Sequence, residues 1–222
     1  MIEAEITAAM SSPTSTHDAS PAITEDIMST STQTVPGAPT AAVAPRGVNH
    51  LVLNVRDIEV SHRFWTEIMG FKCVAELKNR PWKMRFYSGV DDQGGVTHHD
   101  LALAEVPAAD GKDEVAEWKL QPRQVGLNHV AVAWPDRESW LKQIAFLQSR
   151  GVPFLRRVNH GMTHSVYIAD PDGHGIEVLY ELPREVWERD IEGAQNFAEQ
   201  LPTEGEAALV DRTDNPVFPP RA

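Results

Sequence analysis

Three residues of this chain form a set that could bind a divalent metal ion. His50 and His129 each follow an asparagine at the start of an apolar, β-branched run, and Glu177 lies within another such run. Two neutral imidazoles and one carboxylate form the facial triad that holds non-haem Fe(II) and leaves coordination positions open. A single histidine in a strand is more often structural than a ligand. Because the Asn-His pair occurs twice at matching places, we expect His50, His129 and Glu177 to be metal ligands.

A regular pattern of apolar residues surrounds the first of these histidines. Residues 48–55 alternate as in a strand, and residues 57–69 repeat apolar side chains at helical spacing. Asp57 is a favourable helix N-cap, and Gly70 can end the helix in the left-handed conformation. Three further extended stretches follow, at residues 71–78, 82–88 and 97–105. This part of the chain therefore predicts a βαβββ unit.

The same order of elements returns around the second histidine. The pattern predicts a strand at 126–132, a helix at 136–150 and strands at 153–157, 164–169 and 174–181. His50 and His129 are 79 residues apart, and both lie near the start of the first strand of their unit. We interpret this as an internal duplication. A strand offers one side chain to a given face every second residue, so ligands for one ion must come from strands that face one another.

The composition divides the chain into three regions. Residues 1–45 are rich in Ser, Thr, Ala and Pro, with five acids and no Lys or Arg, which predicts a disordered tail. Residues 46–183 hold the two units, as modules at 46–107 and 124–183. Residues 184–222 carry nine acids and four arginines, and we expect a last helix from about 183 to 200 followed by an acidic tail.

Charge and cysteine content exclude several classes of partner and site. The formal net charge of −12 disfavours nucleic acid and anionic membranes as partners. The single cysteine, Cys73, excludes an internal disulfide framework and a zinc site of several cysteines. No run approaches the roughly 20 apolar residues of a membrane span, and the N-terminus has no signal-peptide pattern. We therefore expect a cytoplasmic protein, and a homo-oligomer by general frequency.

One stretch of the second module matches a known family signature. It reads Val158-Asn159-His160, five residues, Val166-Tyr167, two residues, Asp170-Pro171-Asp172-Gly173, three residues and Glu177. This resembles the signature of the type I extradiol ring-cleaving dioxygenases, within the vicinal oxygen chelate superfamily. The duplicated body at 47–183 resembles the paired modules of that superfamily. The resemblance implies an α+β fold in which paired βαβββ modules form one domain.

The resemblance also implies roles for individual residues. It implies that His50, His129 and Glu177 bind iron, and that His99 is the acid-base catalyst beside dioxygen. His160 and Tyr167 match the family's residues that contact the bound catecholate. An imidazole with a pKa of about 6.5 can both donate and accept a proton near neutral pH, which suits acid-base catalysis. The turn at 170–173 has a plainer role, because it aligns two antiparallel strands so that Tyr167 and Glu177 both reach the site.

The strand that contains His99 leaves one alternative open. His98 and His99 are adjacent, so only one of them can point inward. With the register shifted by one, Asp100 and His98 would face the metal and supply a fourth ligand, as in the glyoxalase branch of the superfamily. His164 and His174 flank the site in sequence and are weaker candidates for lining it.

The function implied is that of an Fe(II)-dependent extradiol dioxygenase. It would open a catechol-type ring with dioxygen to a ring-opened semialdehyde, in the degradation of aromatic compounds. Mn(II) is an alternative ion, because it accepts the same ligands. Many family members carry two module pairs, whereas this chain has one and resembles the small members. The competing interpretations are a glyoxalase-like, metal-dependent isomerase or lyase and a metal-free sequestering protein that resembles bleomycin-resistance dimers.

Overall fold

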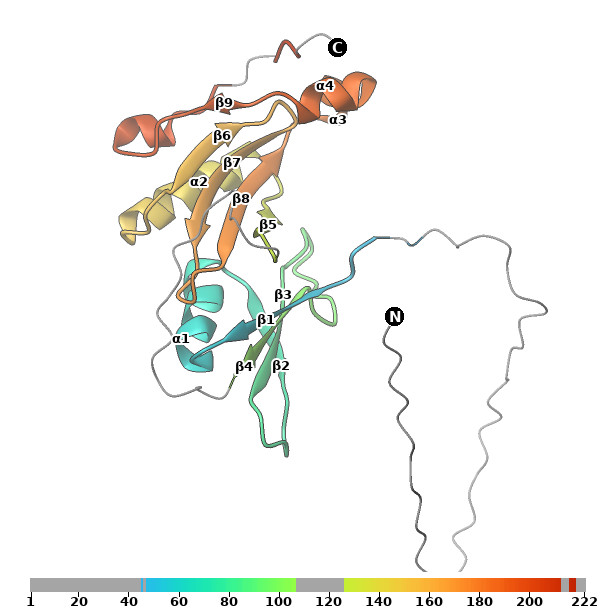
Figure 1. Ribbon diagram of the computed structural model, residues 1–222, viewed down its shortest axis with the longest axis vertical. Coiled ribbons are helices and arrows are strands. Elements are labelled where there is room, and N and C mark those ends of the chain that lie inside the picture. Colours follow the sequence, from blue (N-terminus) through green and yellow to red (C-terminus); the bar gives the residue numbers. More distant parts are fainter. Residues whose placement is uncertain (1–44, 46, 107–125, 213–215, 219–222) are drawn as a thin grey trace, which may run out of the picture. The chain divides into compact units, whose positions relative to one another are not determined.

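A computed structural model describes residues 45, 47–106, 126–212 and 216–218 (Figure 1). The chain divides into two units, Met1–Arg46 and Gly47–Ala222, and all of the described helices and strands belong to the second. Apart from Pro45, the tail predicted at 1–45 lies outside the described residues, and so does most of the connector between the modules.

The first module is a four-stranded sheet with one helix. The strand order is β1-β4-β3-β2, with β1 parallel to β4 and the other neighbours antiparallel. The helix α1 continues directly into a π-helical turn, η1. The elements are β1 (Leu51–Val55), α1 (Ile58–Arg63), η1 (Phe64–Ile68), β2 (Lys72–Glu76), β3 (Met84–Ser88) and β4 (Leu101–Glu105).

The second module repeats this arrangement and extends it by one strand. Its order is β5-β8-β7-β6-β9, again with the first strand parallel to the fourth in sequence. The elements are β5 (His129–Ala133), α2 (Arg137–Ser149), β6 (Arg156–Asn159), β7 (Thr163–Ala169), β8 (Gly175–Glu181) and β9 (Glu199–Gln200). The predicted α+β class and the duplicated βαβββ order are therefore confirmed, although most strands are shorter than predicted.

Local capping explains where both helices begin and end. The Asp57 carboxylate accepts hydrogen bonds from the backbone N–H groups of Glu59 and Val60, at 2.8 and 3.1 Å. Asp136 caps α2 in the same way. The chain leaves the helical segments at Gly70 and Gly151, whose φ angles of 81° and 74° favour glycine. These are the positions at which the sequence pattern predicted the helix ends.

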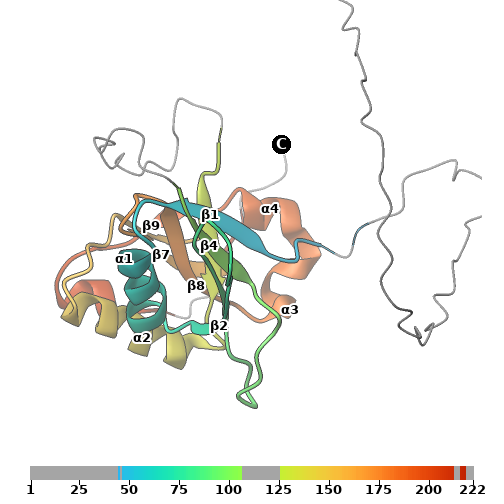
Figure 2. The ribbon, with the colours of Figure 1, turned by 90° about the horizontal axis from the view of Figure 1, so that it is seen from below.

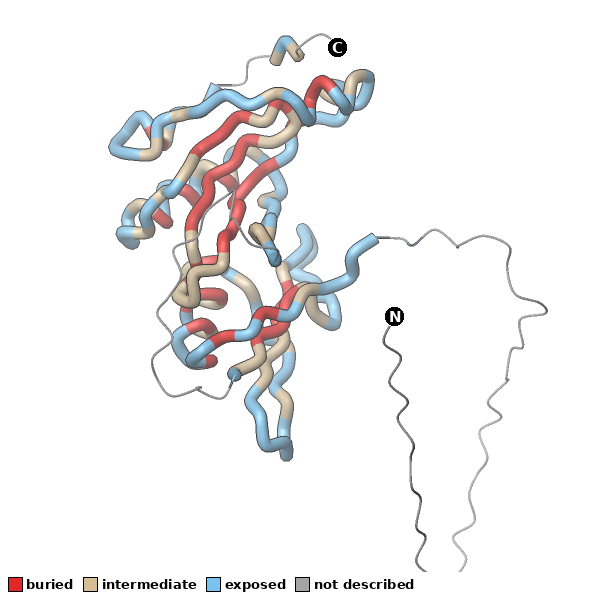
Figure 3. The backbone as a smooth tube through the Cα atoms, in the orientation of Figure 1, coloured by how far each residue is buried: buried red, intermediate tan, exposed pale blue. Residues whose placement is uncertain are grey.

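A shared hydrophobic core holds the sheets and helices of this unit together. Trp65 and Trp140 are completely buried in it, and the Trp140 indole donates to the backbone oxygen of Val178 at 3.0 Å. The helices α1 and α2 lie on the same side of the sheets (Figure 2), and Gln143 of α2 donates to the backbone oxygen of Ile68. Buried positions concentrate in β6, β7 and β8 (Figure 3). The second module thus presents the more continuously buried sheet.

The turn at 170–173 joins the two modules as well as two strands. Asp172 Oδ1 accepts hydrogen bonds from the backbone nitrogen and Nε of Arg56, at 3.1 and 2.8 Å. Its other oxygen accepts from the buried Ser61 hydroxyl at 2.8 Å, and Arg56 also donates to the Pro171 carbonyl. The start of the first module's helix is therefore tied to a turn of the second.

The C-terminal region differs from the single helix predicted at 183–200. The structure has three short segments, α3 (Arg184–Trp187), η2 (Glu188–Asp190) and α4 (Ile191–Gln195), before the chain joins β6 as β9. Asp190 interrupts the helix because its carboxylate caps a new one by accepting from the Gly193 N–H. Ile191, the first residue of α4, is half exposed.

Part of the acidic tail expected after the helix packs against the second module. A further turn, η3 (Glu206–Leu209), leads to Asp211, whose side chain is completely buried. Among the helices that the structure describes, none has the length and apolar character of a membrane span.

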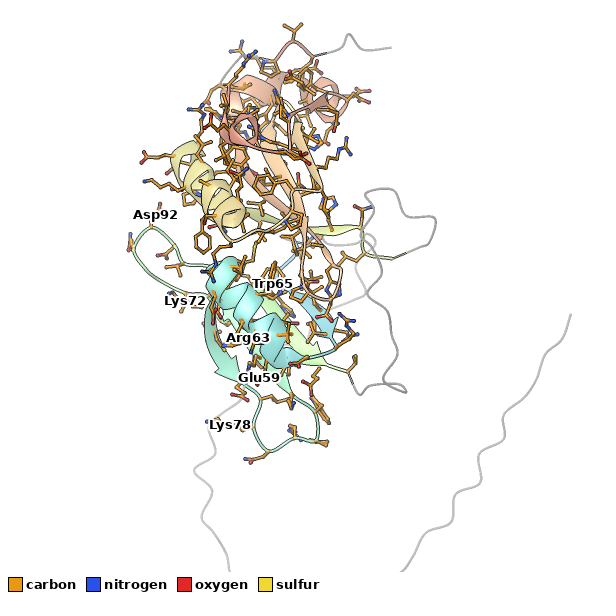
Figure 4. The ribbon with its side chains drawn as sticks, turned by 90° about the vertical axis from the view of Figure 1, so that its left-hand side faces the viewer. Glu59, Arg63, Trp65, Lys72, Lys78 and Asp92 are labelled. Atoms are coloured by element: carbon orange, nitrogen blue, oxygen red, sulfur yellow. The ribbon has the colours of Figure 1, made fainter. Side chains whose placement is uncertain are left out.

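The loops of the first module carry exposed charged side chains. Lys78 lies at the tip of the β2–β3 hairpin, and Asp92 lies in the loop before β4 (Figure 4).

Candidate functional site

Four of the six predicted site residues meet on one face of the second sheet. His129 begins β5, Glu177 lies in β8, Tyr167 lies in β7 and His160 follows β6. His129 Nε2 lies 3.0 Å from Glu177 Oε2, and the Tyr167 hydroxyl donates to Glu177 Oε1 at 2.9 Å. His160 Nε2 lies 3.0 Å from the same hydroxyl. A connected chain of polar groups therefore runs from His129 to His160.

The direction of the hydrogen bonds in this chain follows from the donor count. The Tyr167 hydroxyl has one proton, which it gives to Glu177, so His160 must donate from Nε2 to the phenolic oxygen. Burial raises the pKa of Tyr167 and lowers the pKa of His160. Both groups are therefore neutral near pH 7, and together they can pass a proton along the chain.

The other two predicted residues lie in a separate histidine cluster of the first module. The His50 ring centroid is 4.3 Å from that of His99 and 6.1 Å from that of His98. The Nδ1 atoms of His98 and His99 are 2.7 Å apart. Burial, followed by the neighbouring His50 and His98, lowers the pKa of His99. His50 itself is exposed and immediately precedes β1, although the sequence pattern placed it inside the strand.

Asp100, the alternative to His99, is engaged elsewhere. Its carboxylate accepts hydrogen bonds from the Gly89 N–H at 2.8 Å, the Thr97 hydroxyl at 3.0 Å and the Ser88 hydroxyl at 3.2 Å. These contacts close the loop between β3 and β4. His99 is therefore the residue of this pair that lies beside His50.

The strand registers identify the position in the first module that corresponds to Glu177. In the second module, Glu177 is the strand partner of Ala131, two residues after His129. In the first module, the residue two after His50 is Val52, and its partner in β4 is Ala102. A methyl group cannot bind a metal ion. The duplication therefore supplies a carboxylate at this position in one module and none in the other.

The donor pair of the second module suits a divalent ion. Two adjacent ligands of an octahedral ion, each about 2.1 Å from it, lie about 3.0 Å apart. His129 Nε2 and Glu177 Oε2 are separated by 3.0 Å, and Glu177 is buried. Among the described residues, however, no group of three His, Cys, Asp or Glu side chains lies within reach of one ion. The structure thus assembles two of the predicted ligands and leaves His50 apart from them.

Two flanking histidines have other partners. His164 is buried on the opposite face of β7, where its Nδ1 lies 2.6 Å from Asp211 Oδ1. His174 Nδ1 lies 2.9 Å from Asp170 Oδ2, and this hydrogen bond raises the pKa of His174. Both histidines therefore support the structure of the second module.

Arg156 is a residue of the site face that the motif did not include. It is the strand partner of Tyr167, and it lies four residues before His160. Paired residues of adjacent strands share a face, as do residues separated by an even number along a strand. The predicted strand at 153–157 ended before His160, whereas β6 begins at Arg156. With the strand placed at 156–160, alternation would have put Arg156 on the same face as His160.

A cleft of about 750 Å³ also lies between the modules. It is lined by residues of β5, of the end of the first module's helical segment and of α2, including Val130, Val132, Trp65, Met69 and Gln143. None of the six predicted site residues lines it. Four of these residues lie instead on the sheet face that carries His129 and Glu177.

The family model described as the Glyoxalase/Bleomycin resistance protein/Dioxygenase superfamily matches residues 47–178. The chain is 29% identical over 151 residues to catechol-2,3-dioxygenase of Bacillus subtilis (strain 168), which covers 66% of this chain and 45% of that protein. It is 30% identical over 152 residues to lactoylglutathione lyase of Pseudomonas putida, which covers 61% of this chain and 85% of that protein. The chain thus spans less than half of the Bacillus relative.

A solved glyoxylase/bleomycin resistance protein/dioxygenase domain from Frankia sp. EAN1pec is similar at a TM-score of 0.49 and 19% identity. That similarity covers 63% of this chain and 100% of the solved domain. The family model matches more than half of the chain, and the two βαβββ modules have the arrangement that the superfamily resemblance implied. The chain therefore belongs to the Glyoxalase/Bleomycin resistance protein/Dioxygenase superfamily.

Proposed function

We propose that this chain is an Fe(II)-dependent extradiol dioxygenase that opens a catechol-type ring with dioxygen to a ring-opened semialdehyde. The observation that carries the proposal is the pair of corresponding positions, Glu177 and Ala102. A site with two histidines and one carboxylate leaves positions open for two further ligands. An isomerase with a symmetric four-ligand site would require a second carboxylate where this chain has alanine.

The proposed ligands are His50, His129 and Glu177. The contact between His129 and Glu177 supports two of them, and the position of His50 before β1 matches that of His129 in the duplicated module. When bound, Fe(II) would supply Lewis acidity and a path for electrons from the catechol to dioxygen, and it would remain formally divalent over the cycle. Mn(II) fits the same ligand set.

The protein's own residues would position the substrate and carry its protons. A catechol must lose a proton to bind a cation through both oxygens. The hydroxyl of Tyr167 and Nε2 of His160 form a short relay beside Glu177, which supports a role in orienting the catechol oxygens and receiving that proton. His99 is the proposed acid-base catalyst, since its imidazole lies beside His50 and Asp100 is engaged in a loop.

A lactoylglutathione lyase-like activity is the second candidate. Its specific support is the similarity to the Pseudomonas putida lyase, which extends over 85% of that protein. Such an activity would need a fourth metal ligand from a residue other than Ala102, because a methyl group cannot provide one. The two candidates therefore differ in the number of carboxylates that contact the ion.

The test is anaerobic reconstitution with Fe(II), followed by a panel of catechols with oxygen uptake and product absorbance recorded together. The control is His129→Ala. We expect one oxygen consumed per yellow semialdehyde formed, and loss of both signals in the control. Bound metal without oxygen uptake, together with turnover of a glutathione hemithioacetal, would favour the lyase. A protein that binds no metal would favour a sequestering function and contradict both enzymatic proposals.

We further infer that the enzyme acts in the cytoplasm as a homo-oligomer. The single cysteine is compatible with a reducing compartment, and closed homo-oligomers are common among enzymes of this size. Light scattering on the purified protein would test the assembly. A monomeric mass at micromolar concentration would contradict the inference on oligomeric state.

A further inference from the structure

Arg156 brings a positive charge to the face of the second sheet that holds the proposed substrate contacts. Its strand partner is Tyr167, whose side chain reaches Glu177 on this face. His160, four residues further on, also reaches Tyr167. Strand geometry therefore places the Arg156 side chain on the same side of the sheet as both groups.

The guanidinium of Arg156 is held in position but has no acidic partner among the described residues. Its Nε donates to the side-chain oxygen of Gln200 in β9 at 3.0 Å. The neighbouring Arg157, on the opposite face, pairs with the buried Asp211. No described carboxylate lies within ion-pair distance of Arg156, and the two terminal nitrogens of the guanidinium form no hydrogen bond to any described residue.

A half-buried arginine without an anion is a ready binding group for a planar carboxylate. The two terminal nitrogens of a guanidinium match the two oxygens of a carboxylate, and such a pair is directional as well as strong. Gln200 occupies Nε and so leaves the terminal nitrogens available. A ligand that contacts Tyr167 and His160 with its hydroxyl groups would bring a substituent of its ring toward this group.

We propose that the substrate of this chain is a catechol that carries a carboxylate, and that Arg156 binds this carboxylate. The inference rests on the proposed dioxygenase function and adds a substrate class to it. Gln200 acts as a positioning residue, since it fixes the guanidinium from the neighbouring strand. Uncharged alkyl catechols are then poorer substrates than carboxylated catechols of the same shape.

The test compares matched substrates and matched variants of the full chain loaded with Fe(II). One substrate pair is a catechol with a carboxylate on the ring against methylcatechol, and the other is a catechol with an acetate side chain against ethylcatechol. The variants are Arg156→Gln, Arg156→Lys and Gln200→Ala. The exposed Arg150, at the end of α2, provides the control Arg150→Gln, which removes the same charge from a remote surface.

The measured quantity is the ratio of kcat/KM between the charged and the uncharged member of each pair. We expect the ratio to exceed about ten in the wild type, to fall about tenfold or more in Arg156→Gln, and to recover in part in Arg156→Lys. Gln200→Ala should reduce the ratio less, and Arg150→Gln should not change it. A merely structural role for Arg156 would lower kcat/KM for both members equally and would overturn the inference.

A binding experiment separates this inference from the proposed function. A hydroxybenzoate, which lacks the second hydroxyl group, is titrated into the wild type and Arg156→Gln by calorimetry, with phenol as the uncharged comparison. Cleavage of catechols without any preference for carboxylate would leave the dioxygenase in place and overturn the inference. If no catechol is cleaved, the proposed function fails. In that case, hydroxybenzoate binding that is lost in Arg156→Gln would still support a carboxylate site at Arg156. Equal binding to the wild type and to Arg156→Gln would overturn the carboxylate site.

Discussion

The two modules share one topology but differ in how they hold their polar side chains. In the second module, His129, Glu177, Tyr167 and His160 form a continuous hydrogen-bonded set on a buried sheet. In the first, His50, His98 and His99 form a more exposed group of rings without a carboxylate among the contacts that the structure gives them. The duplicated scaffold therefore carries an asymmetric site.

This difference indicates how the two copies divide their roles. The second module supplies a buried carboxylate held by the Tyr167 hydroxyl, together with the groups that would orient a substrate, and its C-terminal extension adds β9 at the edge of the sheet. The first module supplies imidazoles at the edge of a shorter sheet. The contact between Arg56 and Asp172 ties the two modules together.

The strongest test of this division is removal of one histidine from each module. We expect His129→Ala and His50→Ala each to lower ring cleavage by at least about a thousandfold and to lower the bound metal per chain, because each removes one of the three proposed ligands. Metal analysis and oxygen uptake measure both effects, and circular dichroism checks the fold. If His50→Ala retained full metal content, the ion would belong to the second module alone.

The next largest effect is expected on stability, from the buried carboxylate of Asp211, which lies on the face of the second sheet opposite the proposed site. Asp211 accepts from Nε of Arg137 at 2.8 Å and from the Tyr180 hydroxyl at 2.8 Å, and it also contacts His164. We expect Asp211→Ala to lower the free energy of unfolding by about 3 kcal/mol, because buried cationic and polar partners lose their acceptor. Urea denaturation measures the change, with the exposed Glu204→Ala as control. An equal loss in both variants would contradict the assignment.

The same carboxylate predicts a dependence of stability on pH. Burial would raise the pKa of Asp211, but hydrogen bonds from His164, Arg137 and Tyr180 outweigh it and hold the pKa below its usual value. Its stabilising contribution is therefore complete above the unfolded-state pKa of about 3.9 and is lost as the pH falls through the lower, folded-state pKa. Asp211→Asn should show a smaller loss of stability than the wild type between about pH 5 and pH 3.

A smaller effect is expected from the hydroxyl that links Glu177 to His160. Tyr167→Phe removes both hydrogen bonds and retains the buried ring, so we expect kcat to fall by about tenfold to a hundredfold with the metal still bound. Stopped-flow absorbance of the ring-opened product measures the rate. Unchanged turnover would show that the ordered network of the second module has no part in the chemistry.

The asymmetry between Glu177 and Ala102 can be removed by substitution. Ala102→Glu places a carboxylate at the corresponding position of the first module, and Ala102→Gln is its uncharged control of equal size. We expect the glutamate variant to bind Zn(II) or Ni(II) about tenfold more tightly than the glutamine variant and to cleave catechols more slowly. Equal affinities would mean that this position does not face the ion.

The smallest expected effect concerns the contact that joins the modules. Asp172→Ala removes the acceptor of Arg56 and Ser61, and we expect it to cost about 1 kcal/mol because Arg56 is partly exposed. Thermal unfolding measures the change. A large fall in the rate of ring cleavage in a variant that stays folded would indicate that the contact aligns the histidines of the first module with His129. Glu181→Ala, at an exposed end of β8, is the control.

Much of the fold could be predicted because it depends on local patterns. Alternating apolar residues and helix caps at Asp57 and Asp136 specify each βαβββ unit within a short stretch, and the repeated Asn-His pairs mark the duplication. The C-terminal region was harder to predict, since Asp190 restarts the helix and β9 forms only by pairing with β6.

For the site, the sequence by itself determined which residue types are available, including His129, Glu177, Tyr167 and His160 at the spacing that a sheet requires. Only the tertiary structure decided that Asp100 closes a loop, that Ala102 corresponds to Glu177 and that Arg156 faces Tyr167. The physical reason is strand register: a shift of one residue moves every side chain to the other face, and register depends on partners distant in the chain.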